Sequence, residues 1–277
     1  MPRARCHWAL LIETRNALDE ALPEAYELIV RHRAEFFAGG VAPDAIRLFA
    51  GRDKLGSHFY DDQRPETWDV VVEAMCAAQP VVVDPRRLAP PTRVWLLGYL
   101  AHVLADIAYW RHVITRLPRF PDHVGVHHGA WILADQLPIP ADERTLDVHG
   151  LRFDTAPPWV DEGAVRQMLD RVTGRILIPD GMWPVELTYA RNRPDWQEKG
   201  DAELLGLLVP DWEANVAAAR AALPAETWAA FRADAVSGAV RAITAYLKSP
   251  KLPDIVEGRL GPAWRPPDAD SGSGSGV

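Results

Sequence analysis

Cysteine is scarce in this chain of 277 residues, which contains only Cys6 and Cys76. Two cysteines cannot form the dense disulfide framework of a small secreted domain, so a reducing compartment is expected. Runs of about eighteen apolar residues are absent too, and the sequence therefore predicts no membrane-spanning helix. The first apolar run, at 8–12, ends at Glu13 and is too short for the core of a secretory signal. We therefore expect a cytoplasmic protein.

Excess positive charge is also missing, because 38 Asp and Glu outnumber 30 Lys and Arg and give a net charge of −8. The sequence contains no basic arm or stripe, so no nucleic-acid-binding patch is expected. Apolar material, in contrast, is plentiful, with 48% hydrophobic residues and eleven tryptophans. A chain of this length and composition can bury a sizeable core.

Helical periodicity dominates the chain and alternating strand patterns are scarce, which predicts an all-α fold. The segment 91–117 is apolar on every side, as is typical of a central, buried helix. Residues 14–37 form an amphipathic pattern that Gly39-Gly40 is expected to end, followed by a loop over 41–64. Residues 145–153 are the segment best suited to a short strand pair. Further helices are expected over 65–78, 122–137, 161–173, 211–222 and 225–247.

The central apolar segment carries His102 and Asp106, which are four residues apart and so share one helix face. A buried carboxylate is costly unless it is paired or binds a metal ion. Taken alone, the pair also fits a core network in which Asp106 only orients His102. His123 and His127 repeat the four-residue spacing, which places two imidazoles on one face for zinc. Five of the nine histidines lie between residues 102 and 128, which favours metal binding over a scatter of surface histidines.

The order of these residues is that of a known motif series. His7 is followed by Ala42-Pro43-Asp44, by Ser57-His58-Phe59, by the Gly-Tyr-Leu-x-His-x-x-x-Asp pattern at 98–106, and by His112. This series resembles the zinc-dependent phospholipase C family, with the S1/P1 nucleases as distant relatives. The resemblance implies a multi-helix bundle of the phospholipase C/P1 nuclease type. It covers residues 1–137 and leaves a mostly helical and irregular extension, 138–265, without a match. We interpret residues 1–265 as a single helical metal-binding domain and the Ser/Gly-rich residues 266–277 as a disordered tail.

The resemblance also implies a ligand set for two or three zinc ions, with other divalent metals as alternatives. Asp44, His58, His102 and Asp106 would bind a first ion, and Asp106 would bridge to a second ion held with His7. His112 would bind a third ion with a further histidine–acid pair. His123, His127, His128 and Asp135 all remain candidates for that pair. The resemblance further implies that Asp44 acts as the general base toward an attacking water.

The expected function is that of a metal-dependent hydrolase acting on a phosphate ester or diester, because zinc lowers the pKa of bound water toward about 7. The substrate would be a small molecule or phospholipid-like. Alternatives are hydrolysis of a non-phosphate bond in a biosynthetic route, or a non-catalytic helical binding protein with a remnant metal site. The absence of any His-Asp dipeptide and of Glu-x-x-His pairs disfavours HD-type phosphohydrolases and ferritin-like oxygenases. Candidate substrate-binding residues are Tyr60, Arg111, Arg191 and Arg193.

Overall fold

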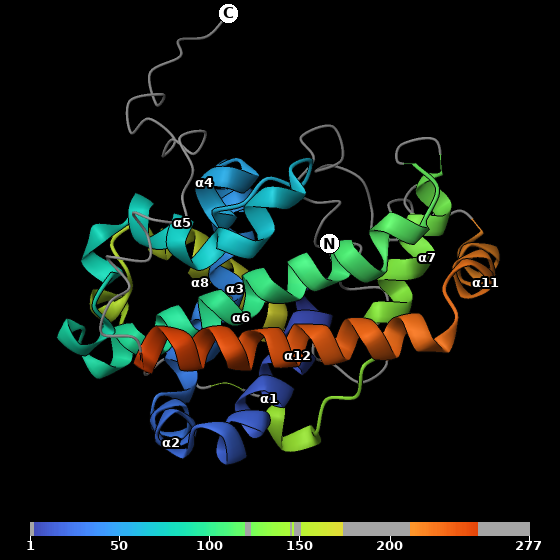
Figure 1. Cartoon of the computed structure of the whole chain (residues 1–277). Coiled ribbons are helices and arrows are strands. Elements are labelled where there is room, and N and C mark those ends of the chain that lie inside the picture. The colour runs from blue at the N-terminus through green and yellow to red at the C-terminus, as the bar shows by residue number, and fades with distance from the viewer. Residues whose placement is uncertain (1–2, 120–122, 145, 147–150, 174–210, 249–277) are drawn as a thin grey trace, which may run out of the picture.

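The computed structural model describes residues 3–119, 123–144, 146, 151–173 and 211–248 (Figure 1). Every regular element in these ranges is helical, which confirms the all-α fold class. The α-helices are α1 (Ala4–Ala21), α2 (Pro23–Arg31), α3 (Arg33–Phe49), α4 (Lys54–His58), α5 (Val71–Ala78), α6 (Pro90–His112), α7 (Val124–Ala134), α8 (Glu162–Arg171), α11 (Trp212–Ala222) and α12 (Ala225–Lys248). Short 3₁₀ turns occur at Pro65–Val70, Pro80–Val82, Pro85–Arg87, Ile114–Arg116, Ala141–Glu143 and Phe153–Thr155.

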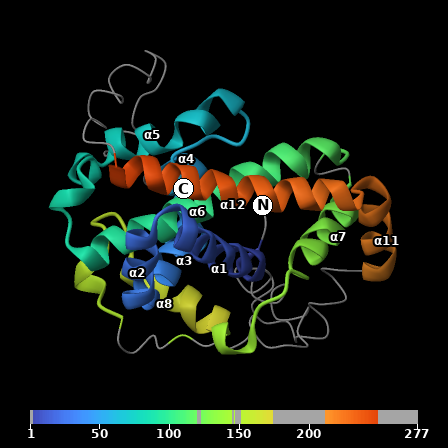
Figure 2. The same cartoon turned by 60° about the horizontal axis from the view of Figure 1, so that its bottom comes forward.

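Helix α6 is the central helix of the fold, as its apolar sequence predicts. From Val94 to Tyr109 every residue except Leu104 is buried. Helices α1, α3 and α12 all pack against it, and α12 runs along much of its length (Figure 1). Figure 2 shows α8 beside α3 and α11 beside α7. These helices lie outside the group formed by α6 and the three helices packed against it. A helix enclosed on all sides needs no polar face, and any polar residue on it must find partners inside the protein.

Most of the predicted helices are confirmed with small changes at their ends, but the predicted stop at Gly39-Gly40 is wrong. Helix α3 continues through both glycines and through Pro43 to Phe49, so most of the predicted loop over 41–64 is helical. The predicted helix at 14–37 begins ten residues earlier, at Ala4, and is divided at Pro23. For the predicted strand pair, residue 146 and residues 151–153 contain no strand, and its other residues lie outside the described ranges.

The two glycines do not end α3 because tertiary packing outweighs their weak helix propensity. A Cβ atom on Gly39 would overlap the carbonyl group of Trp95, and one on Gly98 would overlap the carbonyl oxygen of Phe36. Glycine at these positions therefore allows the backbones of α3 and α6 to touch. This close approach places the C-terminal half of α3, with Asp44, against the middle of α6.

Helices beyond the family-like segment contribute to the same core. Val165 and Leu169 of α8 and Ile243 of α12 belong to one buried cluster with Trp95 of α6. Tyr246 of α12 donates a hydrogen bond to the carbonyl oxygen of Val82 at 2.7 Å. The boundary proposed at 265 and the tail at 266–277 lie outside the described residues. In the described ranges, no helix is both long and apolar enough to cross a lipid bilayer.

Replacing Gly98 by Ala should push α3 and α6 apart. Because the new methyl group would overlap backbone rather than a movable side chain, we expect a loss of about 1–3 kcal/mol or more in the free energy of unfolding, measured by urea denaturation. Gly238→Ala in α12 is the control, since its Cβ would approach nothing closer than an Arg241 guanidinium nitrogen at 3.8 Å. The control should keep or gain stability, by up to about 1 kcal/mol. Equal effects of the two substitutions would contradict the role given to Gly98.

Candidate metal centre

Five polar side chains from four helices meet inside the bundle. His7 comes from α1, Asp44 from α3, His58 from α4, and His102 and Asp106 from α6. All five are buried, and none exposes more than 4% of its surface. The structure therefore brings together five of the predicted metal ligands, which are as far apart as 99 residues in the sequence (7 to 106). We call these five residues the central cluster.

The histidine rings of the central cluster direct their Nε2 atoms at the two carboxylates. Nε2 of His7 lies 3.2 Å from Oδ1 of Asp106, and Nε2 of His58 lies 3.3 Å from Oδ2 of the same residue. Nε2 of His58 is also 3.6 Å from Oδ1 of Asp44, and Nε2 of His102 is 3.9 Å from Oδ2 of Asp106. The rings of His7 and His102 stack with their centroids 3.7 Å apart. Ligand atoms of His7, Asp44 and His102 lie within 4.8 Å of one another, and so do those of His58, His102 and Asp106.

Hydrogen bonds behind the rings determine which nitrogen of His102 and His58 is free. Nδ1 of His102 lies 2.7 Å from the carbonyl oxygen of Gly40, which can only accept, so Nδ1 carries the proton. Nδ1 of His58 lies 2.7 Å from Oγ of Ser57, whose hydroxyl donates to the carbonyl oxygen of Asp53. Ser57 therefore accepts from His58. In their neutral forms both rings present an Nε2 lone pair to the carboxylates, the arrangement found in metal-ligating histidines.

The local sequence explains how these side chains are held. The spacing of four places His102 and Asp106 on one face of α6. Tyr99, one turn earlier, donates a hydrogen bond to the carbonyl oxygen of Ser57 and so ties α4 to α6. Helix α4 ends directly after His58, where Phe59 adopts a left-handed conformation (φ 61°) that turns the chain away. Helix α4 is thereby kept short, with His58 at its last position facing α6.

Charge in the central cluster is negative. Burial raises the pKa of Asp106, but the Lys54 ammonium group and the His58 and His7 side chains outweigh burial and lower this pKa well below its usual value. Burial also acts to raise the pKa of Asp44, but the His58 and His102 side chains outweigh burial and lower this pKa below its usual value. The Asp44 carboxyl group therefore stays ionised as well. Burial and the neighbouring His7 lower the pKa of His102 well below its ordinary value, which keeps the imidazole neutral. Ionised carboxylates and the neutral imidazole of His102 are donors suited to zinc.

Lys54 and Tyr60 complete the surroundings of Asp106. The Lys54 ammonium group bonds to Oδ2 of Asp106 and lies 4.9 Å from the centre of the Tyr60 ring. The Tyr60 hydroxyl donates to the same Oδ2 at 3.3 Å, and burial followed by the charge on Asp106 raises its pKa well above the usual value. Tyr60, predicted as a substrate-binding residue, is thus a buried neighbour of the cluster. The sequence analysis missed Lys54, although its spacing of four from His58 on α4 could have indicated it.

The remaining histidines predicted as ligands lie elsewhere. Nε2 of His112 is 3.1 Å from Oδ2 of Asp234 on α12, and Nε2 of His127 is 2.8 Å from the carbonyl oxygen of Pro118. His123 is exposed just before α7, and the His128 ring lies 5.0 Å from that of Trp131. Within the described ranges, neither group of mutually close ligand atoms includes any of these four histidines.

The acidic candidate for the third ion, Asp135, instead faces the start of α1. Its Oδ1 accepts a hydrogen bond from the backbone N–H of Cys6 at 3.1 Å. Its own carbonyl oxygen accepts from the Arg5 guanidinium at 2.9 Å. A carboxylate at this position satisfies a free N–H group of the first helical turn. Asp135 therefore joins the end of α7 to the beginning of α1.

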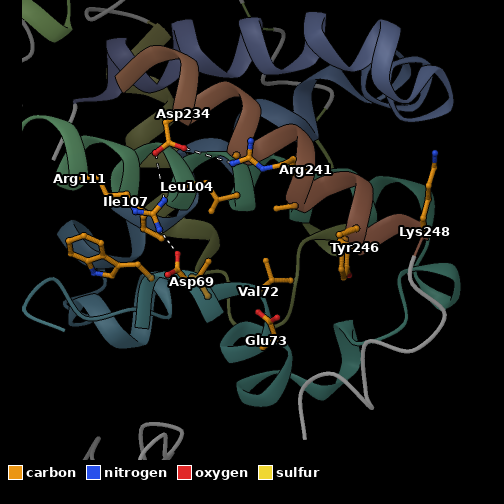
Figure 3. Close-up of a pocket in the computed structure, with 15 residues that line it drawn as sticks. Asp69, Val72, Glu73, Leu104, Ile107, Arg111, Asp234, Arg241, Tyr246 and Lys248 are labelled. Atoms are coloured by element: carbon orange, nitrogen blue, oxygen red, sulfur yellow. Dashed lines mark hydrogen bonds and ion pairs between the residues drawn. The ribbon is translucent and has the colours of Figure 1, made fainter. Parts of the chain in front are cut away.

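Arg111, predicted to bind substrate, lines a pocket of about 690 Å³ beside the central helix (Figure 3). It forms ion pairs with Asp69 and with Asp234, whose Oδ2 lies 3.6 Å from its Nη1. None of the five cluster residues lines this pocket. The other two arginines predicted to bind substrate, Arg191 and Arg193, lie outside the described residues.

Comparison with known proteins agrees with this geometry. A family model described as zinc dependent phospholipase C matches residues 6–139, a segment that contains the whole central cluster. The match confirms the resemblance and, with it, a bundle of the phospholipase C type. No curated protein and no solved structure matches the chain.

The Asp135 carboxylate should make stability depend on pH. Burial raises its pKa to about 6, although Arg3, the Cys6 N–H group and Arg5 oppose the shift. In the unfolded chain the value is about 3.9, so the folded state binds the proton more tightly and stability falls as pH rises from about 4 to about 6. The Asp135→Asn variant lacks this titration. From pH 4.5 to pH 7 its free energy of unfolding should therefore rise by about 1–2 kcal/mol relative to that of the unaltered chain. Urea unfolding with a chelator present measures this difference, and parallel pH profiles would contradict it.

Proposed function

We propose that the chain is a metal-dependent hydrolase of phosphate esters, because residues 6–139 match the model of the zinc dependent phospholipase C family. We place its metal centre at the central cluster of His7, Asp44, His58, His102 and Asp106. The two groups of close ligand atoms found there support a metal centre of this kind. Zinc is the metal that the family and the donor set favour, and other divalent metals remain alternatives.

The observation that carries the proposal is a set of buried nitrogen atoms facing carboxylate oxygens. Among the described residues, Nε2 of His7, His58 and His102 has no hydrogen-bond partner. The bonds to Ser57 and Gly40 place the proton of His58 and His102 on Nδ1, so in the neutral rings Nε2 has no hydrogen to donate to Oδ2 of Asp106, 3.3 and 3.9 Å away. Buried polar atoms without partners cost free energy, and a cation shared between them removes this cost. The residues present therefore fit a metal ion.

Different residues of the cluster would have different roles in hydrolysis. A bound zinc ion would supply Lewis acidity, which lowers the pKa of water toward about 7. The Asp44 carboxylate, held ionised, is the proposed acceptor of a proton from the attacking water. The hydrogen bonds from His58 to Ser57 and from His102 to Gly40 fix the rings before substrate arrives. Burial of the cluster strengthens its electrostatic interactions with a developing phosphate charge.

The family and the cysteine content also suggest a substrate class and a cellular location. We propose a phospholipid-like or small phosphodiester substrate, because the family implies a lipid-like phosphate ester. A cytoplasmic location is proposed from cysteine usage, which is supported by Cys6 and Cys76 both being buried free thiols. The Arg111 pocket is not assigned to this substrate, since the arginine is already paired with two carboxylates.

Substitution of the cluster should remove metal and activity together. We expect His102→Ala and Asp106→Asn to lose bound zinc and to lower kcat/KM on bis(p-nitrophenyl) phosphate by at least about 100-fold, because even supporting partners of a metal site are worth 10–100-fold. Metal analysis after dialysis and a colorimetric assay measure the two effects. Chelation of the unaltered protein should abolish turnover, and added zinc should restore it.

Matched controls are available on the same helices or close to them. His32, at the junction of α2 and α3, and Asp19, exposed on α1, lie outside the cluster. His32→Ala and Asp19→Asn should therefore retain both zinc and activity. Full zinc content in His102→Ala would rule out the proposed centre. Zinc binding without hydrolysis of phospholipid or phosphodiester substrates would instead favour the non-catalytic binding protein.

A further inference from the structure

The central helix opens toward solvent at one position. Among the residues from Val94 to Tyr109, Leu104 alone is not buried. Leu104 and Ile107 line the pocket of about 690 Å³ that lies between α5, α6 and α12 (Figure 3). Leu104 is two residues, and so about half a helical turn, from both His102 and Asp106. The pocket therefore lies on the side of α6 that faces away from the central cluster.

Apolar side chains form most of the surface of this pocket. They come from three helices: Val71 and Val72 of α5, Leu104 and Ile107 of α6, and Ala242 and Ala245 of α12. The lining residues of α12 extend from Asp234 to Lys248, which corresponds to about 21 Å at a rise of 1.5 Å per residue. The volume is that of a small-molecule site. Because the pocket is long relative to this volume, it fits a linear aliphatic chain better than a compact ring system.

Charged side chains at one end of the pocket are paired with one another. Arg111 bonds to Asp69, and its Nη1 lies 3.6 Å from Oδ2 of Asp234. Asp234 in turn lies 3.1 Å from Nε2 of His112 through Oδ2 and 3.9 Å from Nη2 of Arg241 through Oδ1. Figure 3 shows this chain of interactions extending to α12. A charged ligand would have to compete with these pairs, whereas an uncharged ligand leaves them intact.

Two other charged side chains line the pocket, Glu73 of α5 and Lys248 at the end of α12. Their charges are opposite, so together they do not select an anion over a cation. A carboxylate accepts hydrogen bonds and an ammonium group donates them, and a hydroxyl group can bond to either. The polar groups of the pocket therefore suit an uncharged polar head.

We propose that this pocket is a binding site for an uncharged amphiphile with one linear aliphatic chain, such as a long-chain alcohol. The chain lies between α5, α6 and α12, and the burial of its methylene groups supplies the affinity. The site shares no residue with the central cluster. The inference therefore goes beyond the proposed hydrolase and does not depend on it.

Fluorescence titration of the full-length protein with N-phenylnaphthylamine, an uncharged probe that brightens in apolar surroundings, tests the site. We expect saturable binding of one probe molecule per chain. Decanol should displace the probe at lower concentrations than decanoate or decyltrimethylammonium, all three used below their micelle concentrations. A chelator should leave binding unchanged, because no ligand of the proposed metal centre lines the pocket.

Two substitutions alter the pocket without removing a fully buried side chain. Ala242→Phe places a ring in the open space, and Leu104→Gln makes the floor polar at nearly constant length. Each should raise the probe Kd by at least about tenfold. Ala229→Phe, at an exposed position on the same helix, is the matched control. Ala225→Phe alters a second pocket of about 440 Å³ between α7, α11 and α12. Both of these should leave the Kd unchanged.

Four results would overturn the inference. The first is the absence of saturable binding to the unaltered protein, whether other residues of the chain or a second copy of it covers the pocket. The second is a loss of binding in Ala225→Phe with none in Ala242→Phe, which would assign the probe to the other pocket. The third is stronger displacement by decanoate or decyltrimethylammonium than by decanol. The last is an unchanged Kd in folded Leu104→Gln, which also decides the matter if circular dichroism shows that Ala242→Phe does not fold.

Discussion

The central cluster is organised around one buried charge, the carboxylate of Asp106. It has no exposed surface and lies on a helix that is apolar on every other face. Leaving such a charge without partners would cost several kcal/mol. Lys54 of α4 and Tyr60 just beyond α4 bond to it, and His7 of α1 and His58 of α4 direct their Nε2 atoms toward it. The positions of α1 and α4 relative to α6 are therefore tied to the chemistry of the site.

This compensation depends on how closely the helices approach. Helix α3 reaches the cluster because Gly39 and Gly98 remove the side chains that would separate it from α6. The same contact brings the carbonyl oxygen of Gly40 to the His102 ring, where it orients the ring and leaves Nε2 directed at the acids. The contact between α3 and α6 therefore both packs the two helices and orients the His102 ring. Metal-ligating histidines are commonly held by such a second hydrogen bond.

The segment beyond the family-like part also contributes to the interior. Asp234 of α12 pairs with His112 and Arg111, two residues at the end of α6 that were predicted to bind metal or substrate. Asp135, considered for a third ion, caps the first turn of α1 instead. Each of these polar groups has a protein partner, as expected of a purely structural core network. The central cluster differs from them because its Nε2 atoms, in the described part of the chain, have no such partner.

The sequence by itself determined the helical class, the central position of α6, and the register that places His102 and Asp106 together. These features follow from local periodicity, since residues four apart share a helix face whatever surrounds them. The order of motifs was also enough to indicate the family and the five residues of the cluster. Only the tertiary structure decided that α3 passes through Gly39-Gly40, that Lys54 joins Asp106, and that His112 faces Asp234. Each of these depends on contacts between segments far apart in the chain, and local propensity is overridden where such contacts bury backbone or pair charges.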